Sequence, residues 1–341
     1  MHTVRLGKSG ITSPQNAFGA LPIQRISDEE AVAILHRAYE GGMTFFDTAR
    51  FYTDSEHKLG LAFSSMRDRV TIASKTMAST PEEFWRDLST TLSELRCDAL
   101  DLYQFHNPAT CPKPGDGSGL YECMLEARAQ GLIRHIGITN HRLHVAEEAV
   151  RSGLYETLQF PFSYLSSERD RALVALCEAH DVGFIAMKGL SGGLITDARA
   201  AFAFIAQYPN VLPIWGVQRM HELEDFLAFF EEAPVMTEDM RHTIAADIAA
   251  LGGDFCRGCG YCMPCPVGIR INDCARMSQM IRRAPSAPQL SEASQASMER
   301  ITACIGCGAC KSRCPYGLDV PALLRRNLED YRRIVRGETT I

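Results

Sequence analysis

Short apolar runs alternate with helix-length amphipathic stretches along residues 1–230. The runs are rich in β-branched and aromatic residues, as buried strands are, and the stretches between them carry apolar residues at helical spacing. This alternation predicts eight strand–helix units. We expect strands at residues 16–19, 43–47, 70–75, 100–106, 133–139, 157–162, 183–187 and 211–216.

Helix-start signals lie between these runs. Ser27, followed three residues later by Glu30, predicts a capping box, and Thr80 before Pro81 predicts a second helix start. Eight strand–helix units in about 230 residues fit a (β/α)8 TIM barrel. An open, doubly wound sheet is the alternative, although no GxGxxG motif follows an early strand.

The distribution of cysteine separates the C-terminal region from the rest. Nine of the thirteen cysteines lie between residues 256 and 314. Residues 251–341 hold 13 basic and 8 acidic residues, whereas the whole chain has a formal net charge of −6 and so no general attraction to nucleic acid or anionic membranes. We therefore expect a barrel at residues 1–250 and a small second domain at residues 251–341.

Two cysteine runs in this second domain have iron–sulfur spacing. Cys304, Cys307, Cys310 and Cys314, followed by Pro, match the bacterial [4Fe–4S] ferredoxin run. A similar run, one residue shorter in its last interval, consists of Cys256, Cys259, Cys262 and Cys265. In two-cluster ferredoxins the fourth cysteine of a run binds the other cluster. We therefore expect two [4Fe–4S] clusters, with Cys265 and Cys314 exchanged between the runs.

Other interpretations of this region stay open. Cys274 is a spare thiol that could replace an exchanged ligand, and paired CxxC motifs also suit structural zinc. We expect a ferredoxin-like α+β iron–sulfur domain, with the Pro- and Ser-rich residues 282–297 as a loop and residues 320–336 as a helix.

The chain has no apolar run of the roughly 18 residues that a membrane helix needs. Its first residues lack the apolar region of a secretory signal, so we expect a reducing, cytoplasmic setting in which cysteines bind metal rather than form disulfides. The basic C-terminal region has no interleaved aromatic residues to stack bases, so we expect no nucleic-acid partner.

Polar residues end three successive predicted strands. These are Asp47, Lys75 and His106, and Tyr52 follows Asp47 by five residues. Each of them singly suits a structural role, but in a barrel the strand ends meet at one rim. A phenol of pKa about 10 needs a nearby cation to work as an acid or base at neutral pH. We expect Lys75 to supply that cation, Asp47 to pair with Lys75, and His106 to form a hydrogen bond with the substrate oxygen or the phenol.

The segments FFDTARFY, ASKT and YQFHN resemble those of the aldo-keto reductases, whose catalytic tetrad is Asp, Tyr, Lys and His in this order. The cysteine-rich tail resembles that of the branch carrying ferredoxin-type domains. The resemblance to the aldo-keto reductases covers about residues 1–230. It implies that Tyr52 protonates a small carbonyl substrate as hydride arrives from NAD(P)H.

The resemblance also implies contacts with the nucleotide. Asn140 and Gln159 match residues that bind the nicotinamide carboxamide, and Met187, followed by Lys188, falls where the family has a stacking aromatic residue. The loop beside the pyrophosphate matches Gly189, Gly192 and Gly193. The segment that binds the adenosine end matches Gly216, Gln218 and Arg219, and Arg219 could pair with a 2′-phosphate.

Together these features predict an oxidoreductase that interconverts a carbonyl and an alcohol and is coupled to electron transfer through the two clusters. A ferredoxin-like electron carrier is a possible partner, which the basic residues of the tail would attract. Two alternatives are a barrel reductase with purely structural clusters and a non-enzymatic electron-transfer module.

Overall fold

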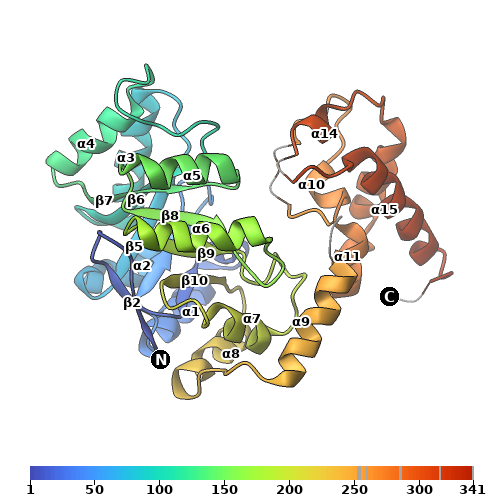
Figure 1. The fold of residues 1–341 in the computed structure, drawn as a ribbon, viewed down its shortest axis with the longest axis horizontal. Helices are drawn as coiled ribbons and strands as arrows, with labels where there is room; N and C mark the ends of the chain where they lie inside the picture. The colour runs from blue at the N-terminus through green and yellow to red at the C-terminus, as the bar shows by residue number, and fades with distance from the viewer. Residues whose placement is uncertain (252–254, 259, 261, 284–285, 315, 340–341) are drawn as a thin grey trace. The chain divides into compact units, whose positions relative to one another are not determined.

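The computed structural model describes residues 1–341 except 252–254, 259, 261, 284–285, 315 and 340–341, and it divides into two compact units (Figure 1). The first contains Met1–Gly189 and Ala198–Met236, and the second contains Leu190–Asp197 and Thr237–Ile341. The division falls before helix α9 (Glu238–Leu251), so α9 belongs to the second unit rather than to the region 1–250 expected for the barrel.

Eight parallel strands form a closed barrel in the first unit, as the sequence predicts, and closure excludes the open doubly wound sheet. The last strand pairs with the first, with Ile214 opposite Ala17 and Trp215 opposite Phe18. The barrel strands are β3 (Ala17–Gly19), β4 (Phe45–Asp47), β5 (Thr71–Thr76), β6 (Leu100–His106), β7 (Ile133–Thr139), β8 (Thr157–Pro161), β9 (Gly183–Met187) and β10 (Val211–Gly216).

Helices surround these strands (Figure 1). The predicted capping box at the first one is present, since the amide of Glu30 donates to Ser27 Oγ (3.2 Å) and the amide of Ser27 donates to Glu30 Oε2 (3.1 Å). The helices of this unit are α1 (Asp28–Glu40), α2 (Ser55–Phe63), α3 (Pro81–Leu95), α4 (Leu120–Ala129), α5 (Leu143–Ser152), α6 (Glu168–Ala179), α7 (Ala198–Ile205) and α8 (Met220–Glu231).

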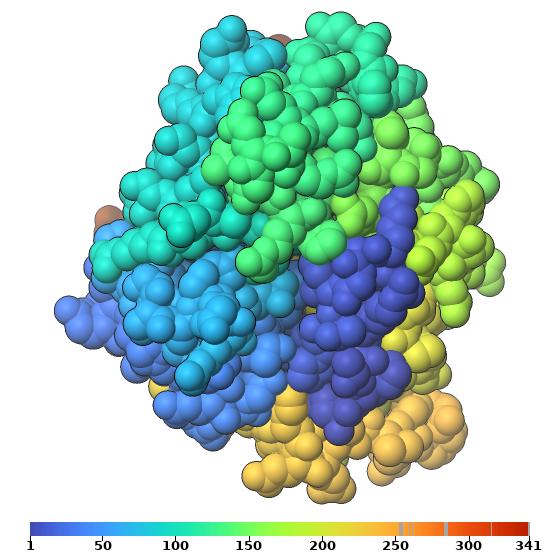
Figure 2. Space-filling model, turned by 90° about the vertical axis from the view of Figure 1, so that its left-hand side faces the viewer, coloured from blue at the N-terminus to red at the C-terminus, as the bar shows by residue number. Residues whose placement is uncertain are grey.

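An N-terminal hairpin of β1 (Thr3–Arg5) and β2 (Thr12–Pro14) covers one end of the barrel. Val4 and Leu6 are fully buried and pack in one cluster with residues at the starts of strands, such as Ala17 and Phe45. In Figure 2 the dark-blue N-terminal segment lies in the middle of one face, bordered by light-blue, green and yellow-green segments. The hairpin thus leaves the carboxyl ends of the strands for the polar residues.

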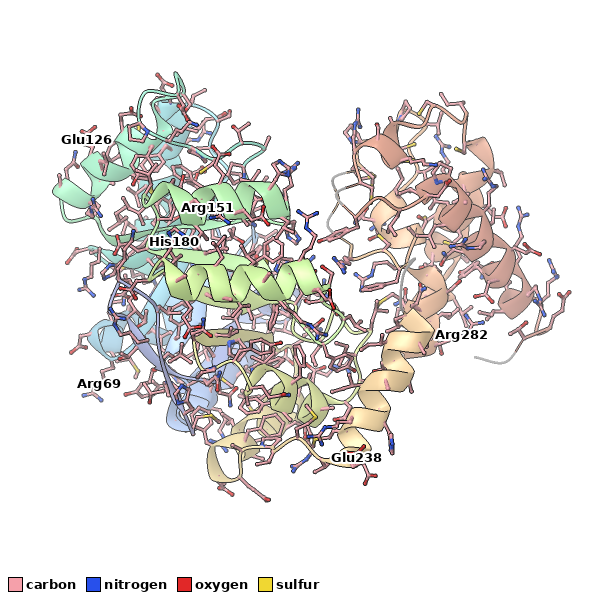
Figure 3. All side chains as sticks on the ribbon, viewed as in Figure 1. Arg69, Glu126, Arg151, His180, Glu238 and Arg282 are labelled. Carbon is pink, nitrogen blue, oxygen red and sulfur yellow. The ribbon has the colours of Figure 1, made fainter. Side chains whose placement is uncertain are left out.

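The described residues of the second unit form helices and turns, with no strand among them, so the expected α+β character is not observed. Sequence rich in Cys, Gly and Pro lacks the alternating apolar pattern that strands need. Besides α9, whose first residue Glu238 is labelled in Figure 3, the helices are α10 (Ile271–Cys274), α11 (Met277–Arg283), α12 (Ser286–Gln289), α13 (Glu292–Glu299), α14 (Ala309–Ser312) and α15 (Val320–Val335).

The segment predicted as a loop, residues 282–297, instead contains α12 and most of α13. Ser291 caps α13 by accepting a hydrogen bond from the amide of Ser294 (3.3 Å). Apolar side chains from α11, α13 and α15 share one core, which includes Ile281, Met298 and Tyr331. In the part of the chain that the structure describes, no helix combines the length and apolar character needed to span a membrane.

The close approach of α2 to α3 generates a stability prediction. Replacing Gly by Ala inside a helix ordinarily stabilises it by about 0.5–1 kcal/mol. At Gly60, however, a Cβ atom would lie 2.1 Å from the carbonyl oxygen of Glu94. We therefore expect Gly60→Ala to lower the free energy of unfolding, by about 1–3 kcal/mol for such overpacking. Chemical denaturation checks this, and an increase in stability would contradict the close contact.

Candidate active site

The structure brings the four predicted polar residues together at the ends of β4, β5 and β6. Asp47 is the last residue of β4, Lys75 lies in β5, and His106 ends β6. Tyr52 lies on the loop after β4, with its ring centroid 5.8 Å from that of His106 and 5.3 Å from Lys75 Nζ. The rings of Tyr52 and His106 meet edge to face, at an interplanar angle of 86°.

An ion pair forms the base of this group. Lys75 Nζ donates to Asp47 Oδ2 (2.6 Å) and to the carbonyl oxygen of Thr48 (2.5 Å). Gln159 Nε2 lies 3.4 Å from the same Asp47 oxygen, and Gln104 Nε2 donates to Gln159 Oε1 (2.9 Å). Burial raises the pKa of Asp47 and lowers the pKa of Lys75, while their mutual attraction opposes both shifts.

The protonation states of Tyr52 and His106 follow from burial. Burial, together with the Asp47 carboxylate, raises the pKa of Tyr52 above its ordinary value of 10.0. This differs from our expectation that Lys75 lowers it, because the Lys75 charge is already paired with Asp47. Burial, aided by Lys75, lowers the pKa of His106 to about 3. At neutral pH the site therefore holds a neutral phenol and a neutral imidazole.

A buried carboxylate holds the loop that carries Tyr52. Glu56 of α2 accepts hydrogen bonds from Ser74 Oγ (2.5 Å) and Thr91 Oγ1 (2.9 Å) and pairs with Arg50. Arg50 Nη2 in turn donates to the carbonyl oxygen of Thr53 (3.2 Å), the neighbour of Tyr52. The sequence analysis did not identify this arrangement, because no local pattern distinguishes Glu56 from the exposed acidic residues around it.

The predicted nicotinamide-contacting residues lie at the ends of β7, β8 and β9. The side chain of Asn140 already makes two contacts, since Nδ2 donates to the carbonyl oxygen of Pro108 (2.9 Å) and Oδ1 accepts from the amide of Arg142 (2.8 Å). Met187 ends β9, and its sulfur accepts from Thr139 Oγ1 (3.9 Å). Lys188 follows in the left-handed backbone region, with φ of 59°.

The predicted adenosine-binding segment lies between β10 and α8. Gly216 ends β10, and the amides of Gln218 and Arg219 both donate to Glu222 Oε2 (2.9 and 3.0 Å). The carboxylate therefore already occupies the N-terminus of α8, and Arg219 is the exposed cation beside it. Phe226, in the middle of α8, is buried and stacks on Trp215.

The glycine-rich loop is shared between the two compact units. Gly189 belongs to the first unit, where its Cα faces the ring of Trp215, whereas Gly192 and Gly193 belong to the second. Within the second unit Arg276 Nη2 donates to the carbonyl oxygens of Ser191 and Gly192, both at 3.0 Å.

Two buried polar atoms at the strand ends have unused hydrogen-bonding capacity. Within the described residues, Asp47 Oδ1 and His106 Nδ1 are buried and have no hydrogen-bond partner. Buried polar groups are nearly always satisfied, so these two atoms mark positions for polar groups of a bound molecule. The donor and acceptor set of Gln159, Asp47 and His106 fits a carboxamide and a carbonyl oxygen.

In the second unit, cysteines from both runs line one cavity, part of which is open to solvent. Cys265 and Cys262 line it from the first run, and Cys304, Cys307 and Cys310 line it from the second. Cys256 and Cys314 are partly buried against the neighbouring core, and Cys259 lies outside the described residues.

Several of the predicted cluster ligands thus lie along one cavity. No three His, Cys, Asp or Glu side chains in the described ranges converge as ligands of a single ion do. Cysteine is the donor type that a [4Fe–4S] cubane takes. Cys274 is fully buried elsewhere, and its thiol donates to the carbonyl oxygen of Ser297 (3.5 Å).

Comparison with known proteins agrees with this geometry. The model of the aldo/keto reductase family matches residues 15–201. The chain belongs to the aldo/keto reductase family. A 4Fe–4S dicluster domain matches residues 255–319, so this aldo/keto reductase is an oxidoreductase with an appended iron–sulfur region.

Relatives and solved structures match mainly the barrel. Methylglyoxal reductase DkgB of Salmonella typhimurium is 34% identical over 214 residues, which cover 59% of this chain and 78% of the relative. An uncharacterised oxidoreductase of Bacillus subtilis, YqkF, is 25% identical over 211 residues, covering 58% and 67%.

Two solved structures share the fold of the barrel. An aldo-keto reductase from Bacillus halodurans has a TM-score of 0.64 at 19% identity and covers 72% of this chain and 96% of its own. One from Klebsiella pneumoniae in complex with NADPH has a TM-score of 0.62 at 22% identity, covering 72% and 94%.

The depressed pKa of His106 predicts a pH dependence of stability. Between the ordinary pKa of about 6.5 and the folded value of about 3, the unfolded chain binds a proton at His106 that the folded chain does not. Stability is therefore lost as the pH falls through this window, by up to about 1.4 kcal/mol per pH unit. We expect His106→Asn to have a shallower dependence, measured by chemical denaturation at several pH values, and equal slopes would contradict a neutral His106.

The shared cavity predicts which cysteines serve one cluster. We expect Cys265→Ala and Cys307→Ala to lose the same cluster, so each reconstituted variant should hold about four fewer iron atoms than the parent. Cys177→Ala, in the barrel core, is the matched control and should keep full iron content. Iron and sulfide assays with EPR check this. If the two variants lost different clusters, the exchange of Cys265 between the runs would be excluded.

Proposed function

We propose that the barrel interconverts a small carbonyl compound and its alcohol with NAD(P)H, and that Tyr52 is the proton donor. The observation that carries the proposal is the convergence of a neutral phenol, a buried Lys75–Asp47 ion pair and a neutral imidazole. The centre of the Tyr52 ring lies 5.3 Å from Lys75 Nζ and 5.8 Å from the centre of the His106 ring. A methylglyoxal reductase among the relatives agrees with a small carbonyl substrate.

The protonation states support donation by Tyr52. In carbonyl reduction, NAD(P)H supplies the hydride. Because its pKa is raised, Tyr52 keeps its proton until the substrate oxygen becomes basic enough to take it. Lys75, 5.3 Å from the centre of the Tyr52 ring, then offsets the charge left on the phenolate. Neutral His106 orients the substrate oxygen through a hydrogen bond rather than supplying a proton.

Other residues would hold the nucleotide. Gln159 retains one amide hydrogen and one acceptor site beyond its contacts with Asp47 and Gln104, which suits a carboxamide. Asn140 has the same spare capacity, and Arg219 offers a cation for a phosphate at the adenosine end. We assign Met187, Lys188, Gly189 and Gly216 to the cofactor on family resemblance.

We further propose that the cysteine-rich region holds two [4Fe–4S] clusters that carry single electrons between the barrel chemistry and a ferredoxin-like carrier. The ligands of one cluster would be Cys304, Cys307, Cys310 and Cys265. Those of the other would be Cys256, Cys259, Cys262 and Cys314. The proposal is supported by the cavity that the four ligands of the first cluster line together with Cys262, which we assign to the second cluster. A purely structural role of the clusters is the competing function.

Replacing the phenol tests the barrel chemistry. We expect Tyr52→Phe to lower the rate of NADPH-dependent methylglyoxal reduction by about 10²- to 10⁴-fold, the usual contribution of a positioned acid, with little change in NADPH affinity. Anaerobic steady-state kinetics and nucleotide fluorescence measure the two quantities. Tyr39→Phe, on helix α1, is the matched control and should stay fully active.

Full activity of Tyr52→Phe would exclude Tyr52 as the proton donor.

The same anaerobic samples distinguish an electron-transfer role of the clusters from a purely structural one. If NADPH bleaches the visible absorbance of the clusters, the clusters exchange electrons with the barrel. Turnover without any bleaching favours clusters that only stabilise the fold.

A further inference from the structure

The second cysteine run forms an exposed edge of the cavity. Cys304, Ile305 and Cys307 are all exposed, and 67% of Ile305 is accessible although it lies between two predicted cluster ligands. All three residues also line the cavity. A cluster held there would lie at the surface, with an apolar side chain projecting beside it. Ile305 therefore offers an apolar contact to a molecule that approaches the cavity from this side.

Two arginines contact residues that line this cavity. Arg300 Nε donates to the carbonyl oxygen of Val267 (2.9 Å), and Arg313 Nη1 lies within 3.4 Å of the carbonyl oxygen of Pro264. Val267 and Pro264 both line the cavity. Both arginines are exposed, and within the described chain neither forms an ion pair with a carboxylate. Their charges are therefore available to a partner.

Several other basic residues of this unit pair with carboxylates. Arg332 pairs with Glu299, and Arg336 Nε pairs with Glu338 (2.6 Å). Arg282, labelled in Figure 3, pairs with Asp330 through Nη1 (2.6 Å). The basic face of α15, expected from the sequence to attract a carrier, is thus offset in part by carboxylates. Around the cavity, residues 300–325 include four basic residues and one acidic residue.

We propose that the edge formed by Ile305, Arg300 and Arg313 docks a small acidic protein that carries one electron. This inference rests on the proposed cluster in the adjoining cavity and adds the site and charge of its partner. One electron passes between the carrier and the cluster, so that one is oxidised as the other is reduced, and no proton or bond is exchanged. The arginines steer the acidic surface, and Ile305 supplies a dry contact beside the cluster.

The test uses the full, reconstituted chain and an acidic plant-type [2Fe–2S] ferredoxin as the probe. Binding is measured by calorimetry with both proteins oxidised, and electron transfer from reduced ferredoxin is measured by stopped flow. We expect the association rate to fall steeply with added salt. The double variant Arg300→Glu and Arg313→Glu should lower it about 10-fold or more, a typical contribution of steering.

Two controls locate the effect. The double variant Arg332→Glu and Arg336→Glu makes the same change in net charge on α15 and should bind ferredoxin nearly as the parent does. Ile305→Asp tests the edge in a chain that keeps both arginines, and it should also weaken binding. Iron content and circular dichroism verify that each variant is folded and loaded.

Equal loss of binding in both double variants would overturn the proposal, because only net charge would matter. Faster reaction with basic cytochrome c than with ferredoxin would overturn it as well. These measurements need no nucleotide or carbonyl substrate. A failure of NADPH-dependent reduction would therefore count against the barrel chemistry and leave the docking result intact.

Discussion

Lys75 and Asp47 form an ion pair 2.6 Å long, and both are almost completely buried. Removing one partner from such a pair leaves a bare charge in the interior, which typically costs about 3–5 kcal/mol. The pair connects β5 to β4, and Gln159 reaches the same carboxylate from β8. This ion pair therefore joins the strands at the polar end of the barrel and also forms the base of the candidate active site. The stability of the barrel and the chemistry of the site depend on the same two residues.

This ion pair also influences the protonation states of Tyr52 and His106. A free lysine ammonium near Tyr52 would favour the phenolate, but this one is shared with Asp47 and the carbonyl of Thr48. Burial then dominates and keeps both Tyr52 and His106 neutral. The phenol of Tyr52 therefore keeps its proton in the resting site. Rigid support by Glu56 and Arg50 keeps the loop that bears this phenol in one arrangement.

Much of this architecture was predictable because it is local in sequence. Apolar runs of five to seven residues that end in Asp47, Lys75 or His106 predict both a strand and its end, and Ser27 with Glu30 predicts a helix start. The support of Tyr52 was not predictable, since Glu56 meets Ser74 and Thr91 only after α2 packs on β5 and α3. The sequence analysis missed helix α13 because it interpreted the Pro- and Ser-rich composition as a loop and did not identify Ser291 as an N-cap. We expected the pKa of Tyr52 to be lowered, but it is raised, because the spacing of residues along the chain does not show that the phenol is buried.

The segment Leu190–Asp197 lies between β9 and α7 in the chain, yet it belongs to the second compact unit, where Arg276 binds its carbonyl groups. The two units are therefore interleaved along the polypeptide and are not consecutive. A chain shortened at Met236 would keep this segment while losing Arg276 and the rest of its surroundings. Removing the iron–sulfur region would therefore also take away the Arg276 donor of the Ser191 and Gly192 carbonyl groups, which lie inside the barrel sequence.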